Sequence, residues 1–242
     1  MKKIFFSNKK SAFSLIELSI VLIIIGLLIA GVTGGASLIK SSELRAIAGE
    51  ARAFATSVNG FYNQFNYLPG DYGIALGGSS TGDADGTIEY DTGGGTTAFE
   101  GRNAWVQMKA ALVLDSNILS SATAVVSPAT GISTFGVNIP ASKIKAAGWD
   151  FDYNSSSTQN VVVLTGPITG GTTDSLTAGS PPYSSGAITP IDALSIDTKV
   201  DDGIANTGKV RGILSACFST TTYTTATTTK ACAISYQIDI NS

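Results

Sequence analysis

The chemistry that this sequence could perform depends mainly on its carboxylates, because it has few other side chains of the usual catalytic types. The chain of 242 residues has 18 Asp and Glu, two Cys and no His. The absence of His excludes Ser-His-Asp and Cys-His catalysis and His-ligated zinc. Paired carboxylates suffice for glycoside hydrolysis, but nothing in the sequence marks a cleft around such a pair. We therefore expect a protein that is not an enzyme and that needs no cofactor, apart from the calcium considered below.

One carboxylate, Glu17, lies at the edge of the longest apolar segment. Leu18 to Ile39 contains no charged residue over 22 positions, and a helix of that length measures about 33 Å, the thickness of a bilayer core. A carboxylate at this depth is costly and therefore a candidate functional residue. The alternative is a Glu that snorkels to the lipid headgroups.

Four lysines precede the apolar segment, and the first twelve residues contain no acid. Lysines before an apolar helix predict a cytoplasmic N-terminus and a C-terminal part on the other side of the membrane. An uncleaved anchor and a secretory signal peptide are both compatible with this arrangement. The apolar region of a signal peptide is shorter, although Gly34-Gly35-Ala36 could imitate its cleavage site.

The string Ala12-Phe13-Ser14-Leu15-Ile16-Glu17 resembles the cleavage motif of type IV prepilins and pseudopilins. The resemblance implies cleavage by a prepilin peptidase between Ala12 and Phe13 and N-methylation of the new amino-terminal Phe13. Ala12 stands where this family usually has Gly, and Gly34 stands where many members have a helix-kinking proline. Together with the length of the chain after cleavage, Gly34 makes the chain more similar to a minor pilin or pseudopilin than to a major pilin.

The resemblance also implies a function. The chain would be a structural subunit of a type IV pilus or of a pseudopilus like that of type II secretion. It would cross the bacterial inner membrane once, with the head in the periplasm, before it enters a periplasmic or extracellular filament. The implied partners are other pilin or pseudopilin subunits, the prepilin peptidase, the inner-membrane assembly platform and membrane lipid.

In such a filament, Glu17 of one subunit would neutralise the Phe13 amine of its neighbour, because unpaired burial of either charge costs several kcal/mol. The alternative function is a minor or tip pilin that acts as an adhesin or ligand-binding module, including DNA capture. The leader holds four of the 15 Lys and Arg residues and none of the 18 acids, so the remaining chain has a formal charge of −7. That charge disfavours nucleic acid as a partner.

Beyond Lys40, apolar residues recur at alternating spacings of three and four, as in a coiled-coil seam. They are Leu44, Ile47, Ala51, Phe54, Val58, Phe61 and Phe65. The charged residues that fall off this stripe are Glu43, Arg45, Glu50 and Arg52. We expect a leader at residues 1–12, one helix over residues 13–67 that spans the membrane at about 18–39, and a globular head over residues 68–242.

The expected fold class is α+β, in which the long helix packs on an antiparallel sheet of the head. Strand patterns occur at residues 161–164, 210–214 and 233–240, and the last of these places Ile234, Tyr236, Ile238 and Ile240 on one face. Helical patterns occur at residues 99–114 and 191–199. The first of these helices would bury Trp105, Met108 and Leu112.

Two further features of the head are candidate sites. Cys217 and Cys232 lie in what would be an oxidising compartment, where a disulfide would contribute about 3 kcal/mol for a loop of this size; two buried free thiols are the alternative. The segment from Asp83 through Asp85 to Glu89 resembles part of a calcium loop, and a solvated turn is its alternative. A second acidic cluster, with the same two interpretations, consists of Asp197, Asp201 and Asp202.

Overall fold

The computed structural model describes residues 14–79, 81–89, 100–115, 119, 133–154, 157–167, 175–176, 185–238 and 240. Ala12 and Phe13, the predicted processing site, lie outside the described residues. The chain divides into two compact units, Met1–Ser42 and Glu43–Ser242. The boundary between these units lies inside the long helix, because the second half of that helix belongs to the core of the head.

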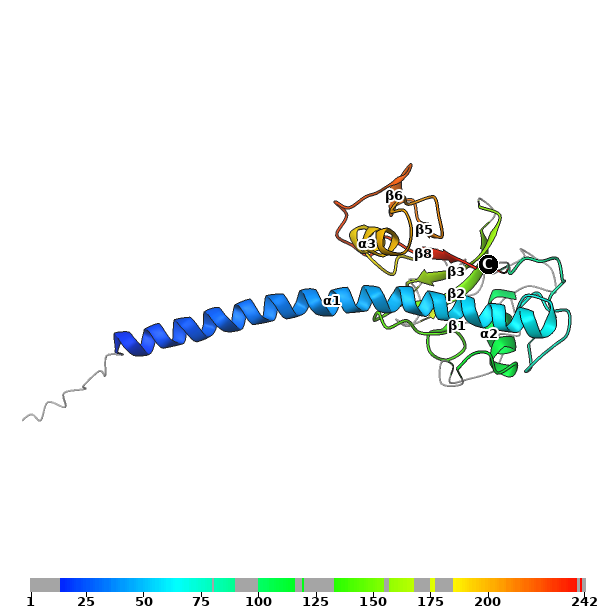
Figure 1. Ribbon diagram of the computed structural model, residues 1–242, viewed down its shortest axis with the longest axis horizontal. Coiled ribbons are helices and arrows are strands. Elements are labelled where there is room, and N and C mark those ends of the chain that lie inside the picture. Colours follow the sequence, from blue (N-terminus) through cyan, green and yellow to red (C-terminus); the bar gives the residue numbers. More distant parts are fainter. Residues whose placement is uncertain are drawn as a thin grey trace, which may run out of the picture. The chain divides into compact units, whose positions relative to one another are not determined.

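The helix α1 (Leu15–Phe65) begins in the first unit and ends in the second (Figure 1). The prediction of a helix over residues 13–67 is confirmed for residues 15–65. The helix ends two residues early because Asn66 takes a left-handed backbone with φ 56°, a conformation that commonly terminates helices. Pro69 and Gly70 follow in a turn.

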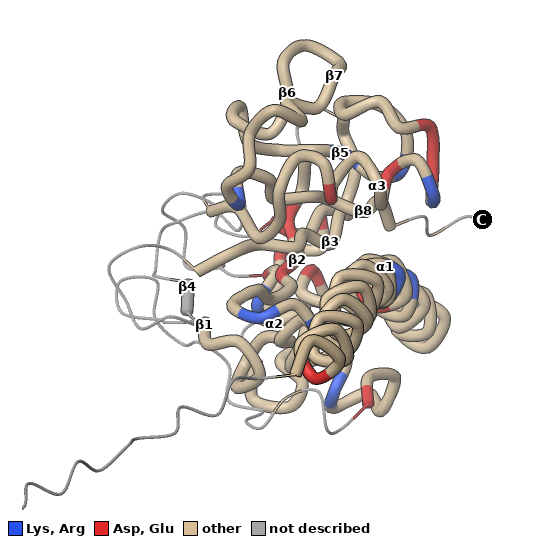
Figure 2. The backbone as a smooth tube through the Cα atoms, turned by 90° about the vertical axis from the view of Figure 1, so that its left-hand side faces the viewer, with Lys and Arg blue, Asp and Glu red and all other residues tan. Residues whose placement is uncertain are grey.

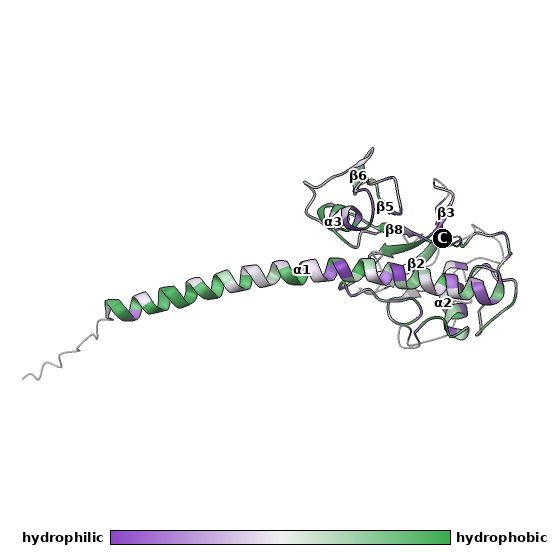
Figure 3. Ribbon diagram, in the orientation of Figure 1, coloured by the Kyte–Doolittle hydropathy of each residue, from purple (hydrophilic) through white to green (hydrophobic). Residues whose placement is uncertain are grey.

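In the first unit, α1 is apolar and uncovered. Among the described residues this is the one helix long and apolar enough to cross a membrane, and none of its most apolar stretch is buried. Figure 3 shows the change from this hydrophobic part to a part of mixed hydropathy farther along the helix. The second half is amphipathic, as predicted.

The predicted stripe of α1 is buried in the head. Six of its seven members are buried and the seventh is partly buried. The six are Leu44, Ile47, Ala51, Phe54, Val58 and Phe61, and Phe65 is the seventh. All seven lie on the same side of the helix, because spacings of three and four residues return to the same face. This face supplies one wall of the core.

The other wall is an antiparallel sheet of four strands in the order β2-β3-β8-β5. These strands are β2 (Gly148–Asn154), β3 (Gln159–Thr165), β8 (Ile234–Gln237) and β5 (Val210–Gly212). Trp149 of β2 faces Leu164 of β3, and Tyr236 of β8 lies between Val162 and Val210. The expected α+β class is confirmed.

Two short strand pairs lie outside this sheet. They are β1 (Ser133–Thr134) with β4 (Ser175–Leu176), and β6 (Phe218–Ser219) with β7 (Thr222–Tyr223). The single-face prediction for the last strand is confirmed, since Ile234, Tyr236, Ile238 and Ile240 all contact the main core.

The described part of the head also contains two shorter helices. The helix α2 (Glu100–Ala110) lies beside α1 near β2 (Figure 2), and the ring of Phe54 contacts those of Trp105 and Trp149 at centroid distances of 5.0 and 5.7 Å. The helix α3 (Pro190–Val200) is capped by the Thr189 side chain, which accepts the N–H of Asp192.

The prediction for Leu112 is wrong. Trp105 and Met108 are fully buried, but Leu112 is 88% exposed. The helix stops at Ala110 and Leu112 takes φ 59°, which directs its side chain away from the core. Leu114 is buried instead.

Candidate functional site

The N-terminal site begins with the first turn of α1, where Glu17 bonds its own chain. The backbone N–H of Ser14 donates to Glu17 Oε2 at 2.9 Å. Ser14 immediately precedes the helix, and Glu17 is its third residue, so the pair forms half of a capping box. Sequence reasoning assigned Glu17 to assembly alone; the spacing Ser-x-x-Glu was the signal for this local role.

The carboxylate of Glu17 is exposed, and one of its oxygens remains outside the bond to Ser14. It lies at the positive end of the helix dipole, where an anion is stabilised. In this geometry the Glu17 side chain caps the helix of its own chain, and its other carboxylate oxygen remains accessible to a cation.

A surface of exposed aliphatic side chains follows Glu17 along α1. Leu15, Val32 and Leu38 are 87%, 70% and 74% exposed, and the apolar residues between them are similarly uncovered. A contiguous apolar surface of this kind is a site for lipid or for other helices. Gly26, Gly31, Gly34 and Gly35 have open space where a Cβ would lie, so other helices could approach the backbone closely there.

The predicted disulfide between Cys217 and Cys232 is present, and both residues are fully buried. Neither cysteine is a free thiol. Cys232 also exchanges backbone hydrogen bonds with Ile188, at 3.1 and 3.0 Å. The bond therefore joins the segment around β6 and β7 to the segment that leads into β8.

Asp83 and Asp85 lie in an exposed turn, residues 83–87, which we call the acidic turn. Their carboxylates lie within 4.8 Å of that of Asp71, a partner from outside the predicted segment that sequence reasoning missed. Asp71 is buried and accepts the N–H groups of Asp85 and Gly86 at 3.0 and 2.9 Å. Burial raises the pKa of Asp71 to about 6, although these hydrogen bonds lower it. Calcium binding here stays a prediction.

The helix α2 holds the acidic turn and the loop before it through buried polar side chains. Gln107 accepts the N–H of Gly70 at 2.7 Å, and Glu100 accepts that of Asp83 at 3.1 Å. Burial, together with a hydrogen bond with the Glu89 carboxyl, raises the pKa of Glu100 to about 8. Glu100 is thus largely protonated at neutral pH, and its role is to anchor the turn.

The second acidic cluster has a structural role in the turn after α3. Asp197 is fully buried and accepts the Tyr223 hydroxyl at 2.8 Å and the Gly203 N–H at 3.1 Å. Burial raises the pKa of Asp197 to about 6. The carboxylates of Asp201 and Asp202 accept N–H groups of the same turn, from Lys209 and Ile204. Calcium binding by this cluster also stays a prediction.

Comparison with known proteins identifies the prokaryotic N-terminal methylation motif at residues 7–33. No curated protein and no solved structure matches the chain. The matched residues contain the string from Ala12 to Glu17 and the first half of the apolar surface, so the expected prepilin-type motif is confirmed. A long N-terminal apolar helix followed by an antiparallel sheet is also the architecture expected of a type IV pilin.

Proposed function

We propose that this chain, a pilin-like or pseudopilin-like subunit, is cleaved between Ala12 and Phe13, N-methylated on Phe13 and assembled through α1 into a pilus or pseudopilus. The observation that carries the proposal is the methylation motif at residues 7–33, which continues directly into an uncovered apolar helix. The partners are the prepilin peptidase, the inner-membrane assembly platform and other subunits of the filament. In this role the chain is structural and is not an enzyme.

Before assembly, the first half of α1 lies in the bacterial inner membrane. The four lysines before the apolar segment support a cytoplasmic N-terminus and a periplasmic head. Lipid covers the exposed aliphatic side chains in this state. On assembly, helices of neighbouring subunits take the place of lipid, and close packing at the glycines favours that exchange.

Glu17 acts twice in this proposal. In the single subunit it bonds the N–H of Ser14. In the filament its carboxylate also pairs with the methylated amine of Phe13 from a neighbouring subunit, because an uncompensated charge among apolar helices costs several kcal/mol. A subunit in the wrong axial position leaves both charges unpaired, so the pair selects the correct register.

The first test is the N-terminus of the protein taken from membranes, read by intact mass and sequencing. The proposal expects a chain that begins at N-methylated Phe13. A chain that begins at Met1, or one that is cut near Ala36, would overturn the proposal and leave an anchored or a secreted head.

The second test separates the two roles of Glu17. Glu17→Gln keeps an oxygen that accepts the Ser14 N–H but removes the charge, whereas Glu17→Ala removes both. We expect Glu17→Gln to be processed normally and to enter the membrane, yet to yield no filaments that shearing can recover. Ser14→Ala, which retains the backbone N–H and the charge of Glu17, is the matched control and should assemble. Normal filaments from Glu17→Gln would refute charge pairing.

A further inference from the structure

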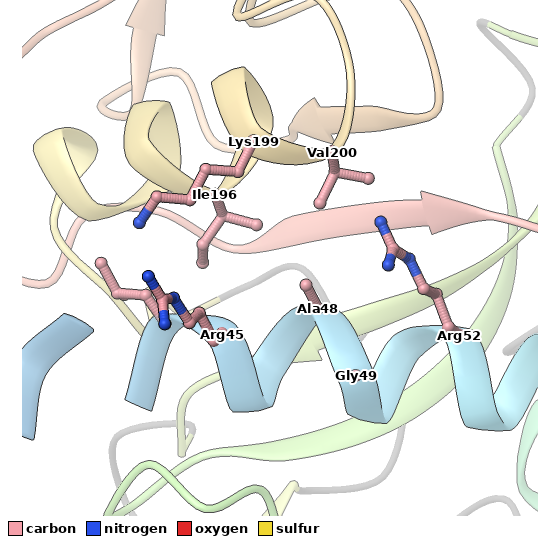
Figure 4. Close-up of a pocket in the computed structure, with 8 residues that line it drawn as sticks. Arg45, Ala48, Gly49, Arg52, Ile196, Lys199 and Val200 are labelled. Atoms are coloured by element: carbon pink, nitrogen blue, oxygen red, sulfur yellow. The ribbon is translucent and has the colours of Figure 1, made fainter. Parts of the chain in front are cut away.

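A groove between α1 and α3 gathers three basic side chains, and none of the described residues that line it is acidic (Figure 4). We call it the basic groove; its volume is about 430 Å³. Its lining residues from α1 are Leu44, Arg45, Ala48, Gly49 and Arg52, and those from α3 are Ile196, Lys199 and Val200. The groove lies wholly within the head unit Glu43–Ser242.

The geometry of the groove follows from helical spacing. Arg45 and Arg52 are seven residues apart, so both point from the same face of α1 toward α3, with Ala48 between them (Figure 4). Lys199 extends from α3 over this space. Ala48 and Gly49 have too little side chain to fill it, and buried Ile196 forms an apolar wall.

The three cations have no counter-charge among the described residues of the head. Arg45, Arg52 and Lys199 are exposed, and across the described ranges none of their side chains makes a hydrogen bond or an ion pair. Gathering like charges beside an apolar wall is unfavourable, and an entering anion removes the repulsion. The placement is unusual in a chain whose formal charge after the leader is −7.

The complementary charge lies at the other end of the head. The acidic turn follows the C-terminal end of α1, whereas α3 and the basic groove flank the part of α1 at which the head begins (Figure 1). Asp83 and Asp85 are exposed. Each uses one carboxylate oxygen, Oδ1, to accept local hydrogen bonds, which leaves the other oxygen for an arginine.

The acidic turn is also narrow. Ala84 and Gly86 separate the acids from each other and from Thr87, and both take positive φ, 64° and 93°. The turn thus presents two carboxylates on a tight backbone with small intervening side chains, a shape that enters a groove between two helices more easily than a broad surface does.

We propose that the basic groove receives the acidic turn of the next copy of this chain, in a head-to-tail contact. The inference rests on the proposed function and names the head surfaces that meet in the filament. A contact between two different surfaces of identical subunits repeats from copy to copy, and where the rotation does not close into a ring it builds an open helical filament. The charges on the two ends of the head therefore suit a filament.

A second copy fits the groove better than the other anions available to the head. Nucleic acid is repelled over long range by the net negative charge. A lipid phosphate would satisfy the cations, but it would leave the exposed carboxylates of the acidic turn unpaired. The contact between copies pairs both ends at once.

The test is a charge exchange in the full-length chain, expressed in its native host. The first variant carries Arg45→Glu with Arg52→Glu, the second carries Asp83→Lys with Asp85→Lys, and the third carries all four changes. The matched control is Lys145→Glu with Lys230→Glu, which reverses two exposed charges outside the groove. Processing is measured by intact mass, and filaments are measured by shearing.

We expect each paired reversal to lower the yield of filaments by about tenfold or more, the effect of losing ~1.4 kcal/mol per contact. The four-fold exchange should restore the yield, and the control should match the unchanged protein. Independently, Arg52→Cys with Asp85→Cys in one chain should give disulfide-linked ladders in filaments, whereas either single cysteine should not.

Normal filaments from the first variant would overturn the head-to-tail contact. The contact would also be overturned if the variant with all four changes formed no filaments although its subunits were processed and unfolded at the normal temperature. The groove would then hold some other anion, such as lipid phosphate. An unchanged chain that keeps its leader or never assembles would instead overturn the proposed function.

Discussion

The carboxylate of Glu50 in α1 accepts the indole N–H of Trp149 in β2 at 2.9 Å. The same oxygen accepts the hydroxyl of Ser142 at 2.8 Å, and the other accepts the N–H of Lys143 at 3.0 Å. One side chain of the helix thus bonds three groups of the head. The apolar stripe sets which face of α1 is buried, and Glu50 adds directional bonds that fix where along the helix the head is attached.

Replacing Glu50 should therefore loosen the head from α1. We expect Glu50→Ala to lower the free energy of unfolding of the head by about 1.5–3 kcal/mol, the usual loss for hydrogen bonds to a charged group. Thermal unfolding of the purified full-length protein in detergent measures the change. Glu43→Ala, which removes a similarly half-buried Glu about two turns before Glu50, should change the midpoint little. Equal losses for the two variants would contradict the role given to the Glu50 hydrogen bonds, because Ala is the better helix former and propensity alone predicts no loss.

Glu100 should make the head less stable as the pH rises from about 6 to about 8. Burial raises its pKa from 4.5 to about 8, so in this range the folded chain holds a proton that the unfolded chain has released, and stability falls with rising pH. The expected loss is on the order of 2 kcal/mol. Glu100→Gln stays neutral, keeps an acceptor for Asp83, and should flatten the pH dependence of the unfolding midpoint.

The control for that experiment is Glu43→Gln, which should retain the slope of the unchanged protein. Asp71, Asp150 and Asp197 also have pKa values raised to about 6, in each case chiefly by burial. The pH dependence of stability that these three carboxyl groups cause falls between about pH 4 and 6, below the range of pH 6 to 8 in which Glu100 is tested. A slope that persists above pH 6 in Glu100→Gln would contradict the assignment.

The bond from Tyr223 to Asp197 should matter more in alkaline than in acidic solution. Tyr223→Phe removes the hydroxyl that stabilises the charged carboxylate, so the pKa of Asp197 should rise above about 6. Above this pKa we expect a loss of about 1.5–3 kcal/mol, and a smaller loss near pH 5, where the carboxyl is neutral. Unfolding at both pH values checks the difference. Tyr236→Phe, on the sheet, should show no such dependence.

Removing the disulfide should destabilise the C-terminal part of the head. We expect Cys217→Ser with Cys232→Ser to lower the free energy of unfolding by about 3 kcal/mol. The single variant Cys217→Ser should lose a similar amount, because either change breaks the bond. A midpoint that is unaffected by both variants and by added reductant would contradict the expectation.

The parts of the fold that were predictable are those in which burial repeats with a regular period. The stripe of α1 returns every three or four residues, and Ile234 and Ile238 return on one face of the last strand segment. A repeated pattern averages over many positions, so a local exception does not obscure it. The prepilin-type motif was predictable for a different reason, since six adjacent residues carry it.

The end of α2 was not predictable because its stop signal is unusual. The N–H of Val113 bonds the carbonyl of Met108, and that of Leu112 bonds the carbonyl of Lys109. This is the pattern of a Schellman motif, but the left-handed position is held by Leu112 where Gly is the common residue. Without that Gly, the helical spacing suggested that α2 continued.

The strand β2 and the partner of its buried Asp150 were not predicted. The strand β2 has a regular alternation that is typical of a strand: the aromatic residues Trp149, Phe151 and Tyr153 alternate with Asp150 and Asp152. Asp150 is fully buried because α2 covers it: its Oδ1 accepts the Trp105 indole N–H at 3.2 Å. Contacts of this kind join residues far apart in the chain, and spacing does not reveal them.

The bond between Cys217 and Cys232 also determines what a protease can achieve. Most of the threonine-rich segment between the two cysteines is exposed, and exposed loop tips are the usual places for a first cut. A cut there would separate two pieces of backbone that stay covalently joined through the sulfurs, with Ile188 still paired to Cys232. A nicked subunit would keep its mass on a gel without reductant and would fall into two fragments only when the disulfide is reduced.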